Sequence, residues 1–453
     1  MEIEYFRHPD ARAGSAPLAA RAGDFVFVGG QMAVHPTQGV PAEVTGTPGR
    51  PFHGSGMERQ INYIYSNLSH TLSELGSSIR QIMKINSYHI NGDEVDMALR
   101  LRKDFFGVEA PPPSTLVMIP ETTVPGATVV LDVTTLANAS VRPRSIVLQP
   151  RAQQHSDYKP VPLRSLYGWP VFSQASRGGG FIFTVGVGGR ELDKEHPETL
   201  PRLDERTHEY AQPLPQPKFP YEHNRMAMQT EWILTGLKGV LEAAGTSLEH
   251  VVRAEIHLSH MKHLTALNKV WERFFPVDPP ARVIVPLALA RPDIMLVEIE
   301  LIAVDPEGPY RKEIIGTTDA PTPLGPEPQA VRAGPYVYLS TQLATDFKHG
   351  LAHEAQPDVA FPFHSSGIVR EVRYIYKNVE SILRAAGTSP TNLVKRRAVH
   401  LHLGDLADAE ECWREKLFDR LPPTTVFRVE GPLAVPGCTV QYDLTGYIPD
   451  WQR

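Results

Sequence analysis

Arg282 and Glu298 are charged residues at positions where β-strands are predicted, which makes them candidates for chemistry. Arg282 opens the apolar run 283–285, and Glu298 lies inside the apolar run 294–304. A carboxylate among apolar residues is costly unless it has a partner or a task. A guanidinium can bind a carboxylate through two parallel hydrogen bonds, and a partly buried glutamate can serve as a general acid or base. We predict that the two residues lie on a hairpin turning at 292–293, as an acid–base site or as a structural ion pair.

The strands that would position this pair belong to a unit that occurs three times. A glycine turn followed by an alternating strand appears at residues 21–31, 177–187 and 332–342. The equivalent positions Gly30, Gly186 and Thr341 are separated by 156 and 155 residues. Such regular spacing is typical of a repeat architecture.

Further repeated blocks follow in the same order. A glycine ends a predicted amphipathic helix in each copy, and a basic residue follows eight positions later, at Lys84, Arg253 and Lys395. Each unit is then predicted to contain strands, a helix, a strand, a helix and two strands, which is an α+β fold with mixed or antiparallel pairing. We place the units at residues 1–143, 144–310 and 311–453. The second unit carries a longer loop at 189–220, which is as consistent with a lid as with a solvated excursion.

Composition narrows the function classes. The chain has 453 residues, 42% of them hydrophobic, and a net charge of −6, so it is expected to be a globular protein without a preference for nucleic acid. Its two cysteines, Cys412 and Cys438, exclude a disulfide framework and a cysteine-rich metal site. No apolar run has the length of a signal peptide core or a membrane span, so we expect a cytoplasmic protein that does not bind membranes.

The order of these blocks resembles the RidA (YjgF) family. The resemblance covers nearly the whole chain as three tandem units, and it is closest in the second unit, at 167–175, 268–275, 280–282 and 297–300. It implies a chorismate mutase-like fold and trimers around a central β-barrel, with ligand clefts at the subunit contacts. We therefore expect an intrachain pseudo-trimer that is a monomer or a dimer of such chains.

The resemblance also implies roles for residues of the second unit. Arg282 would bind the carboxylate of the substrate, and Glu298 would position the water that hydrolyses an imine or enamine, without a cofactor or a metal. Four further positions would complete the site: Gly186 by close backbone approach, Phe172 as a ring wall, Asn268 as a polar contact in a neighbouring cleft, and Ile284 through its backbone. Ile284 departs from the cysteine or threonine of many members, and the segment from Arg282 to Glu298 is one residue longer than usual, so the substrate is left open.

The other two units lack the same pair. The position of the arginine is Ser114 in the first unit and Thr424 in the third, and the position of the glutamate is Val130 and Gln441. None of these residues clamps an anion as a guanidinium does. We therefore expect at most one cleft of the family type in each chain, with units one and three as scaffold.

Several histidines are weaker candidates. His53 and His364 precede helices in units one and three, where a serine that caps the helix explains the pattern more simply than a histidine acting as a proton donor. His257, His260 and His263 are spaced by three residues, but no further ligand completes a standard metal site, so we expect no metal.

Three functions are compatible with these observations. The first is a cofactor-independent hydrolase or deaminase of a small carboxylate-bearing imine, enamine or related nitrogen compound in a specialised pathway. The second is a chorismatase-type hydrolase of a chorismate-like dicarboxylate. The third is a module that binds a small carboxylate without turnover. The acidic balance disfavours an endoribonuclease.

Overall fold

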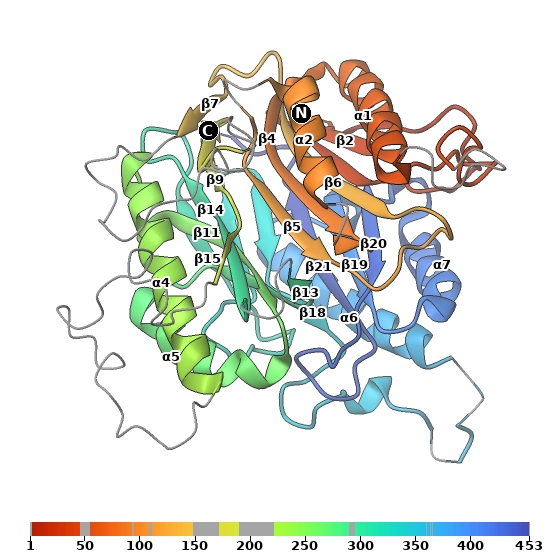
Figure 1. Cartoon of the computed structure of the whole chain (residues 1–453). Helices are drawn as coiled ribbons and strands as arrows, with labels where there is room; N and C mark the ends of the chain where they lie inside the picture. The colour runs from red at the N-terminus through yellow and green to blue at the C-terminus, as the bar shows by residue number, and fades with distance from the viewer. Residues whose placement is uncertain are drawn as a thin grey trace.

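Three β-sheets, each with a pair of helices, make up the chain in the computed structural model. It describes residues 2–45, 55–92, 95–107, 111–147, 172–189, 222–289, 295–358, 360–362, 364 and 366–452. Figure 1 shows the helix pairs on the outside of the molecule and the strands of the three sheets in its middle. None of the helices in these residues has the length and apolar character needed to cross a membrane.

The first sheet is formed almost entirely by the first unit. Its order is β1-β2-β3-β6-β4-β5-β13, and the last strand comes from the second unit. Its elements are β1 (Glu4–Phe6), β2 (Ala19–Ala22), β3 (Phe25–Gln31), α1 (Gly56–Glu74), β4 (Ser77–His89), α2 (Val95–Phe106), β5 (Ser114–Met118), β6 (Val129–Ala137) and β13 (Ala288–Leu289).

The second sheet has the order β12-β11-β14-β9-β8-β7, with β10 paired to β14. Its elements are β7 (Ser145–Val147), β8 (Ala175–Gly178), β9 (Phe181–Thr184), β10 (Val187–Gly188), α4 (Glu222–Ala243), β11 (Val251–Leu258), α5 (Leu264–Phe274), β12 (Ala281–Pro286) and β14 (Val297–Val304). The long loop predicted at 189–220 lies outside the described residues except for Gly189.

The third sheet has the order β15-β16-β17-β21-β19-β20, with β18 paired to β21. Its elements are β15 (Lys312–Ile315), β16 (Ala330–Ala333), β17 (Tyr336–Leu339), β18 (Gln342–Leu343), α6 (Gly367–Ala385), β19 (Leu393–His400), α7 (Leu406–Leu417), β20 (Thr424–Arg428) and β21 (Val440–Tyr447). The predicted α+β order of strands and helices is confirmed in all three units, and so is mixed pairing, because β4–β5, β11–β12 and β19–β20 are parallel.

Two expectations about the strands are wrong. The strand of Arg282, β12, and the strand of Glu298, β14, do not form a hairpin, because β11 lies between them. The helix α5 carries the chain from β11 to a parallel neighbour, as parallel pairing requires, and β14 then pairs with the other edge of β11. A closed central barrel is also not seen in the described part of the chain, where the three sheets are open and joined by one strand pair, β5–β13.

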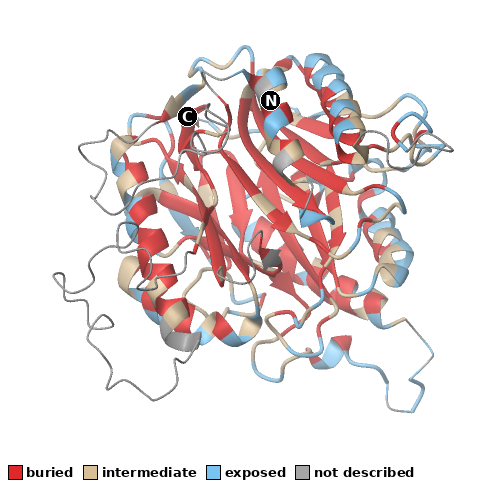
Figure 2. Ribbon diagram, in the orientation of Figure 1, coloured by how far each residue is buried: buried red, intermediate tan, exposed pale blue. Residues whose placement is uncertain are grey.

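The central strands of the sheets are buried on both faces, whereas helices such as α1 and α7 have exposed residues on their outer side (Figure 2). The helices form because their apolar residues recur with a helical period, which places a stripe of them on the sheet. Helix α1, for example, buries Ile61, Ile64 and Leu68 and begins at Ser55, whose hydroxyl accepts a hydrogen bond from the Glu58 backbone N–H at 3.2 Å. Because the helices lie outside and the strands inside, the units contact one another through the edges of their sheets.

Equivalent residues of the three units meet inside the molecule. Phe25, Phe181 and Tyr336 follow the three glycine turns, and their ring centroids lie 5.4–5.7 Å from one another. Three buried ion pairs then join the units in cyclic order: Lys84 with Glu300, Arg253 with Asp443, and Lys395 with Asp132. The bases are those that the sequence places eight residues after each helix-ending glycine.

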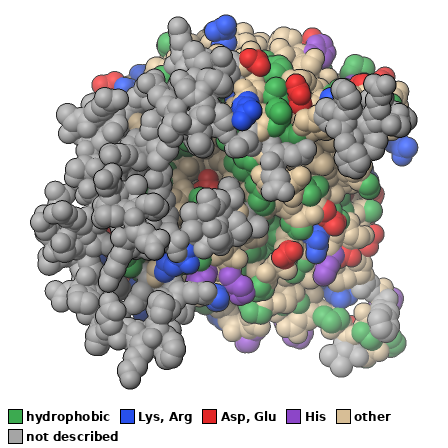
Figure 3. Space-filling model, viewed as in Figure 1, with side chains coloured by type: hydrophobic (Ala, Val, Ile, Leu, Met, Phe, Trp, Pro, Cys, Tyr) green, Lys and Arg blue, Asp and Glu red, His purple; other side chains and the backbone are tan. Residues whose placement is uncertain are grey.

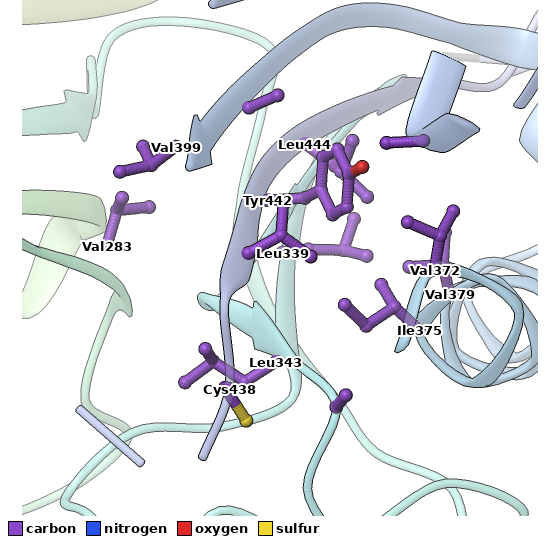
Figure 4. Close-up of a cluster of buried hydrophobic side chains, with 14 of the residues drawn as sticks. Val283, Leu339, Leu343, Val372, Ile375, Val379, Val399, Cys438, Tyr442 and Leu444 are labelled. Atoms are coloured by element: carbon purple, nitrogen blue, oxygen red, sulfur yellow. The ribbon is translucent and has the colours of Figure 1, made fainter. Parts of the chain in front are cut away.

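Apolar packing also crosses from unit to unit. Val283 of β12 points toward Val399 of β19 in the cluster shown in Figure 4, which continues through Leu339, Tyr442 and the helix α6. The edge strand β12 of the second unit is therefore fixed against the third unit by burial as well as by hydrogen bonds.

Candidate functional site

The edge strand of each unit lies against the next unit in a ring. In the first contact, between units one and two, the Gly186 N–H donates to the Ser114 carbonyl at 3.2 Å. In the second contact, between units two and three, the Thr341 N–H donates to the Arg282 carbonyl at 2.8 Å. In the third contact, between units three and one, a Cβ on Gly29 would lie 2.7 Å from the Thr424 nitrogen. In each contact, the residue equivalent to Arg282 thus lies against the segment that follows the glycine turn of the next unit.

Arg282 is held at the second contact by a complete set of partners. Its side chain is 1% exposed, and Nε and Nη2 both contact Oε2 of Glu327 from the third unit. Its Nη1 donates to Oδ1 of Asn268 at 2.8 Å, and its guanidinium lies 5.3 Å from the ring centroid of Trp271. Both of these partners are on α5. A carboxylate, an amide and an aromatic face are the partners that a buried guanidinium prefers.

The backbone around Arg282 is also satisfied across the second contact. The Ile284 N–H donates to Oγ1 of Thr341 at 3.0 Å, and its carbonyl accepts from Nε2 of Gln441 at 2.9 Å. The Arg282 N–H donates to Oγ of Ser340 at 3.1 Å. Ile284 and Asn268 therefore lie with Arg282 at the second contact, where Asn268 binds Arg282 itself, whereas the resemblance implied a contact in a neighbouring cleft. The third unit contributes Gln441 to this contact, through the Ile284 carbonyl.

Glu298 lies at the first contact. It is 5% exposed on β14, directly across from His257 on β11, and no hydrogen bond to its carboxyl is found within the described residues. A Cβ on Gly186 would lie 2.4 Å from Oε1 of Glu298 and 2.3 Å from Oγ1 of Thr115. Glycine at 186 therefore keeps open the space beside this carboxyl, between a strand of unit one and a strand of unit two.

The electrostatic surroundings of Glu298 favour its neutral form near neutral pH. Burial raises the pKa of Glu298 to about 7, and the charges of His257 and Lys84 oppose that rise. Lys84 is committed elsewhere, since its Nζ contacts Glu300 at 2.9 Å and donates to Thr115 and the Thr184 carbonyl at 2.8 Å. A carboxyl that titrates near pH 7 without a fixed partner is suited to accept and return a proton.

The structure does not bring Arg282 and Glu298 together. Paired residues of neighbouring strands point to the same face of a sheet, and successive residues alternate. Arg282 pairs with Ala254, whereas Glu298 pairs with His257, three positions away on the same strand. The two side chains therefore leave opposite faces of the sheet, toward different neighbouring units.

Each contact consequently holds a different pair at the two chemical positions. The first contact combines Ser114 with Glu298, the second combines Arg282 with Gln441, and the third combines Thr424 with Val130. In a ring of identical units, each contact would receive the arginine from one unit and the glutamate from the next. The arginine and the glutamate of one unit thus always lie in separate contacts, and because units one and three of this chain lack the pair, neither contact of the second unit holds both residues.

Phe172 belongs to the side of the first contact. It is partly buried against the core of the second unit, and the hydroxyl of the next residue, Ser173, donates to the Pro111 carbonyl of the first unit at 2.6 Å. Figure 3 shows a hollow on this face of the molecule in which an acidic side chain is visible. The six predicted residues thus form two groups: Gly186, Phe172 and Glu298 at the first contact, and Arg282, Ile284 and Asn268 at the second.

A buried charge network lies behind Glu298. Glu255 accepts from Arg397 at 2.6 Å, from Arg253 at 3.0 Å and contacts Nε2 of His257 at 2.8 Å, and Asp443 joins both arginines. Burial alone would raise the pKa of Glu255, but Arg397 and Arg253 hold it well below its usual range. Both carboxylates are paired with buried arginines, although Oδ1 of Asp443 has no hydrogen-bonding partner among the described residues, and these ion pairs join the second unit to the third.

The remaining histidine candidates receive little support. His53 lies outside the described residues, and His364 is exposed. The described residues contain one group able to share a metal ion, His8, Asp10 and His35, with Nε2 of His35 at 3.2 Å from Asp10. In both rings Nδ1 accepts a backbone N–H, which places the proton of the neutral ring on the Nε2 that a metal would need. The cluster is better explained by these hydrogen bonds.

Three residues of these contacts were not identified as site residues from the sequence. Thr115 follows the predicted arginine position of unit one and lies beside Gly186. Lys84 was recognised as one of three repeated bases, but the repeat did not reveal its partner. Glu327 lies in the proline-rich segment before β16, and its type and spacing give no signal that it reaches Arg282.

Comparisons with known proteins agree with this fold. A family model described as Endoribonuclease L-PSP matches residues 218–305, within the second unit. The RutC family protein y4sK of Sinorhizobium fredii is 35% identical over 101 residues, which cover 22% of this chain and 71% of that protein. A mouse protein named 2-iminobutanoate/2-iminopropanoate deaminase is 29% identical over 118 residues, covering 26% and 79%. The crystal structure of RidA from an Antarctic Psychrobacter shares 26% identity, with a TM-score of 0.24, over 30% of this chain and 99% of that one.

The family model lies within the second of three units, each of which has a pair of helices and a mixed sheet. The chain belongs to the RidA (YjgF) family, as the order of its sequence blocks predicts.

Proposed function

We propose that the protein is a hydrolase of small imine or enamine compounds and that Glu298, at the first contact, is its acid–base group. The observation that carries this proposal is a carboxyl that is 5% exposed, has no hydrogen-bonding partner in the described residues and has a pKa of about 7. The name of the mouse relative, an imine deaminase, supports the reaction class.

The chemistry requires one group that first takes a proton and then gives one back. The Glu298 carboxylate accepts a proton from water while the water oxygen bonds to the imine carbon, and the carboxylic acid so formed returns that proton to the nitrogen, which gives a neutral carbinolamine. The carboxylate then takes the hydroxyl proton of the carbinolamine and passes it to the amine nitrogen as the C–N bond breaks, leaving a carbonyl compound and ammonia. A pKa near the working pH serves both directions.

Binding of a substrate carboxylate at the first contact is expected to be weak. The position equivalent to Arg282 is Ser114 there, and Lys84 is already paired with Glu300. A hydroxyl is a weaker partner for a carboxylate than a guanidinium is. Carboxylate-bearing imines should therefore be turned over with a high KM.

The test is turnover of 2-iminobutanoate, generated in the assay, by wild type and Glu298→Gln. Glutamine preserves the shape of the residue but cannot transfer the proton, so kcat should fall by about 100-fold or more. Glu272→Gln changes an exposed glutamate on α5 and serves as the matched control. Wild-type kcat in Glu298→Gln would show that the acid–base group lies elsewhere.

We further propose that one chain takes the place of three subunits. The three mutually contacting rings and the cyclic ion pairs support this arrangement, because each joins equivalent residues of all three units. Analytical ultracentrifugation should then give the mass of one chain or of a dimer of chains. The mass of a trimer of chains would argue against the replacement of three subunits by one chain.

A second candidate function is binding of a small carboxylate at the second contact. Arg282 already holds a carboxylate there, that of Glu327, while the third unit contributes Gln441, whose Nε2 donates to the Ile284 carbonyl and which cannot act as an acid or base. Such a site has the means to bind but not to hydrolyse.

A further inference from the structure

The segment that carries Glu327 is hydrogen-bonded at its two ends and carries an exposed side chain between them. We call residues 321–328, Pro-Thr-Pro-Leu-Gly-Pro-Glu-Pro, the strap. The Pro321 carbonyl accepts from Nε2 of Gln329 at 3.0 Å, and the Pro328 carbonyl accepts from Oγ of Ser340 at 2.7 Å. Between these points the Leu324 side chain is 80% exposed. The prolines keep the strap extended and limit the conformations it can adopt when free.

One side chain of the strap, close to its Pro328 end, holds it to the second unit. Glu327 contacts Nε and Nη2 of Arg282, and its own N–H is bonded locally to the Gly325 carbonyl at 2.8 Å. A Cβ on Gly325 would lie 2.7 Å from Nη2 of Arg282 and from Oε2 of Glu327, so the strap runs directly over the ion pair. No other side-chain hydrogen bond of residues 322–327 is found in the described structure.

The chemistry of Arg282 sets the condition for opening the strap. Its guanidinium is 1% exposed, and without Glu327 it would retain only Asn268 and the Trp271 ring. A buried cation without an anionic partner is strongly unfavourable. A second carboxylate in the same place would restore the ion pair, so exchange of one carboxylate for another is far less costly than opening alone.

Access to Arg282 requires the same exchange. Its side chain is 1% exposed, and the strap lies directly over the ion pair at Gly325. A small organic acid can therefore reach the guanidinium only when Glu327 and the strap move away.

We propose that Glu327 is an internal ligand of Arg282 and that a small carboxylate from solution displaces it, releasing the strap. This inference rests on the second proposed function, carboxylate binding at the second contact. The ligand class is a monocarboxylate of a few carbon atoms, such as a 2-oxo acid, because it must fit where the end of a glutamate side chain lies. The site is self-occupied, and its affinity for the ligand is reduced by the internal competitor.

The first experiment measures binding of 2-oxobutanoate by calorimetry to wild type and to Glu327→Gln. Glutamine keeps a hydrogen bond to Arg282 but removes the competing charge, so the variant should bind at least about tenfold more tightly. Glu313→Gln is the matched control, since it removes the partner of another arginine, Arg332, at an exposed position of the same unit, and it should bind as wild type does. Adding Arg282→Gln to Glu327→Gln should abolish the gain.

The second experiment follows the strap itself. A dye attached to Leu324→Cys is selective because the two native cysteines, Cys412 and Cys438, are buried. In the otherwise wild-type chain, 2-oxobutanoate should lower the dye anisotropy in a saturable way, and in Glu327→Gln the anisotropy should be low from the start.

The outcomes separate the inference from the proposed function beneath it. Tighter binding by Glu327→Gln together with the anisotropy change supports both. Equal affinity of wild type and Glu327→Gln, or binding without an anisotropy change, overturns the internal-ligand role and leaves carboxylate binding in place. Absence of binding to either protein overturns both, and Glu327 is then a permanent partner of Arg282.

Discussion

Replacing Glu298 with glutamine should change how the stability of the protein depends on pH. A carboxyl whose pKa is about 7 in the folded protein, but near 4.5 when unfolded, binds more protons in the folded state between these values. The free energy of unfolding therefore decreases as pH rises through this range, because ionised Glu298 is buried without a hydrogen-bonding partner. Below the unfolded pKa the penalty is absent.

The size of the effect follows from the two pKa values. A difference of about 2.5 units corresponds to a total of about 3 kcal/mol, of which about 2 kcal/mol is lost between about pH 5.5 and about pH 8.5. Because Glu298 is 5% exposed, solvent screening reduces this figure little. Glutamine has no charge to bury, so Glu298→Gln should be the more stable protein at alkaline pH.

Urea unfolding of wild type and Glu298→Gln at a series of pH values measures this difference. The free energies of the two proteins should diverge by about 2 kcal/mol across that range, while Glu272→Gln, at an exposed position, should follow wild type. Groups remote from Glu298 titrate equally in both proteins and cancel in the comparison. Parallel curves for wild type and Glu298→Gln would refute the argument that Glu298 is a buried carboxyl with a raised pKa.

Three further predictions concern the contacts. Ser114→Arg supplies the missing guanidinium opposite Glu298, so KM for 2-iminobutanoate should fall by about tenfold or more, and an unchanged KM would show that the substrate does not lie there. Gly186→Ala places a Cβ 2.4 Å from Oε1 of Glu298, so kcat should fall at constant expression, and retained kcat would mean that this space is not used. Glu255→Gln removes one of the two carboxylates that balance buried Arg253 and Arg397, so unfolding should require about 3–5 kcal/mol less, as measured in urea, whereas a loss below about 1 kcal/mol would contradict the pairing.

The architecture within each unit was largely predictable from the sequence. Glycine turns, helix ends and apolar strands recur in one order, and each of these signals depends on residues close together in the chain. The three bases Lys84, Arg253 and Lys395 were found by the same repetition. Their partners were not, because the register of a repeat does not say which unit lies next to which.

The separation of Arg282 from Glu298 could not be predicted from the sequence patterns. Both residues lie on apolar strands of one unit, and the pattern of either strand is satisfied whether it pairs with the other or with β11. The face to which each side chain points follows only from the register across three strands. Glu327 is harder still, since a glutamate between prolines is typical of a solvated linker, and only the structure places it on Arg282.

Arg282 and Glu298 belong to different contacts of the second unit. A double-mutant cycle on kcat/KM for 2-iminobutanoate tests this separation. Arg282→Gln, Glu298→Gln and the double variant are compared with wild type. If the residues act independently, the effects of the single changes should add within about 0.5 kcal/mol. If they form one catalytic unit, each change alone would cost nearly as much as both together, and that strong non-additivity would contradict the account.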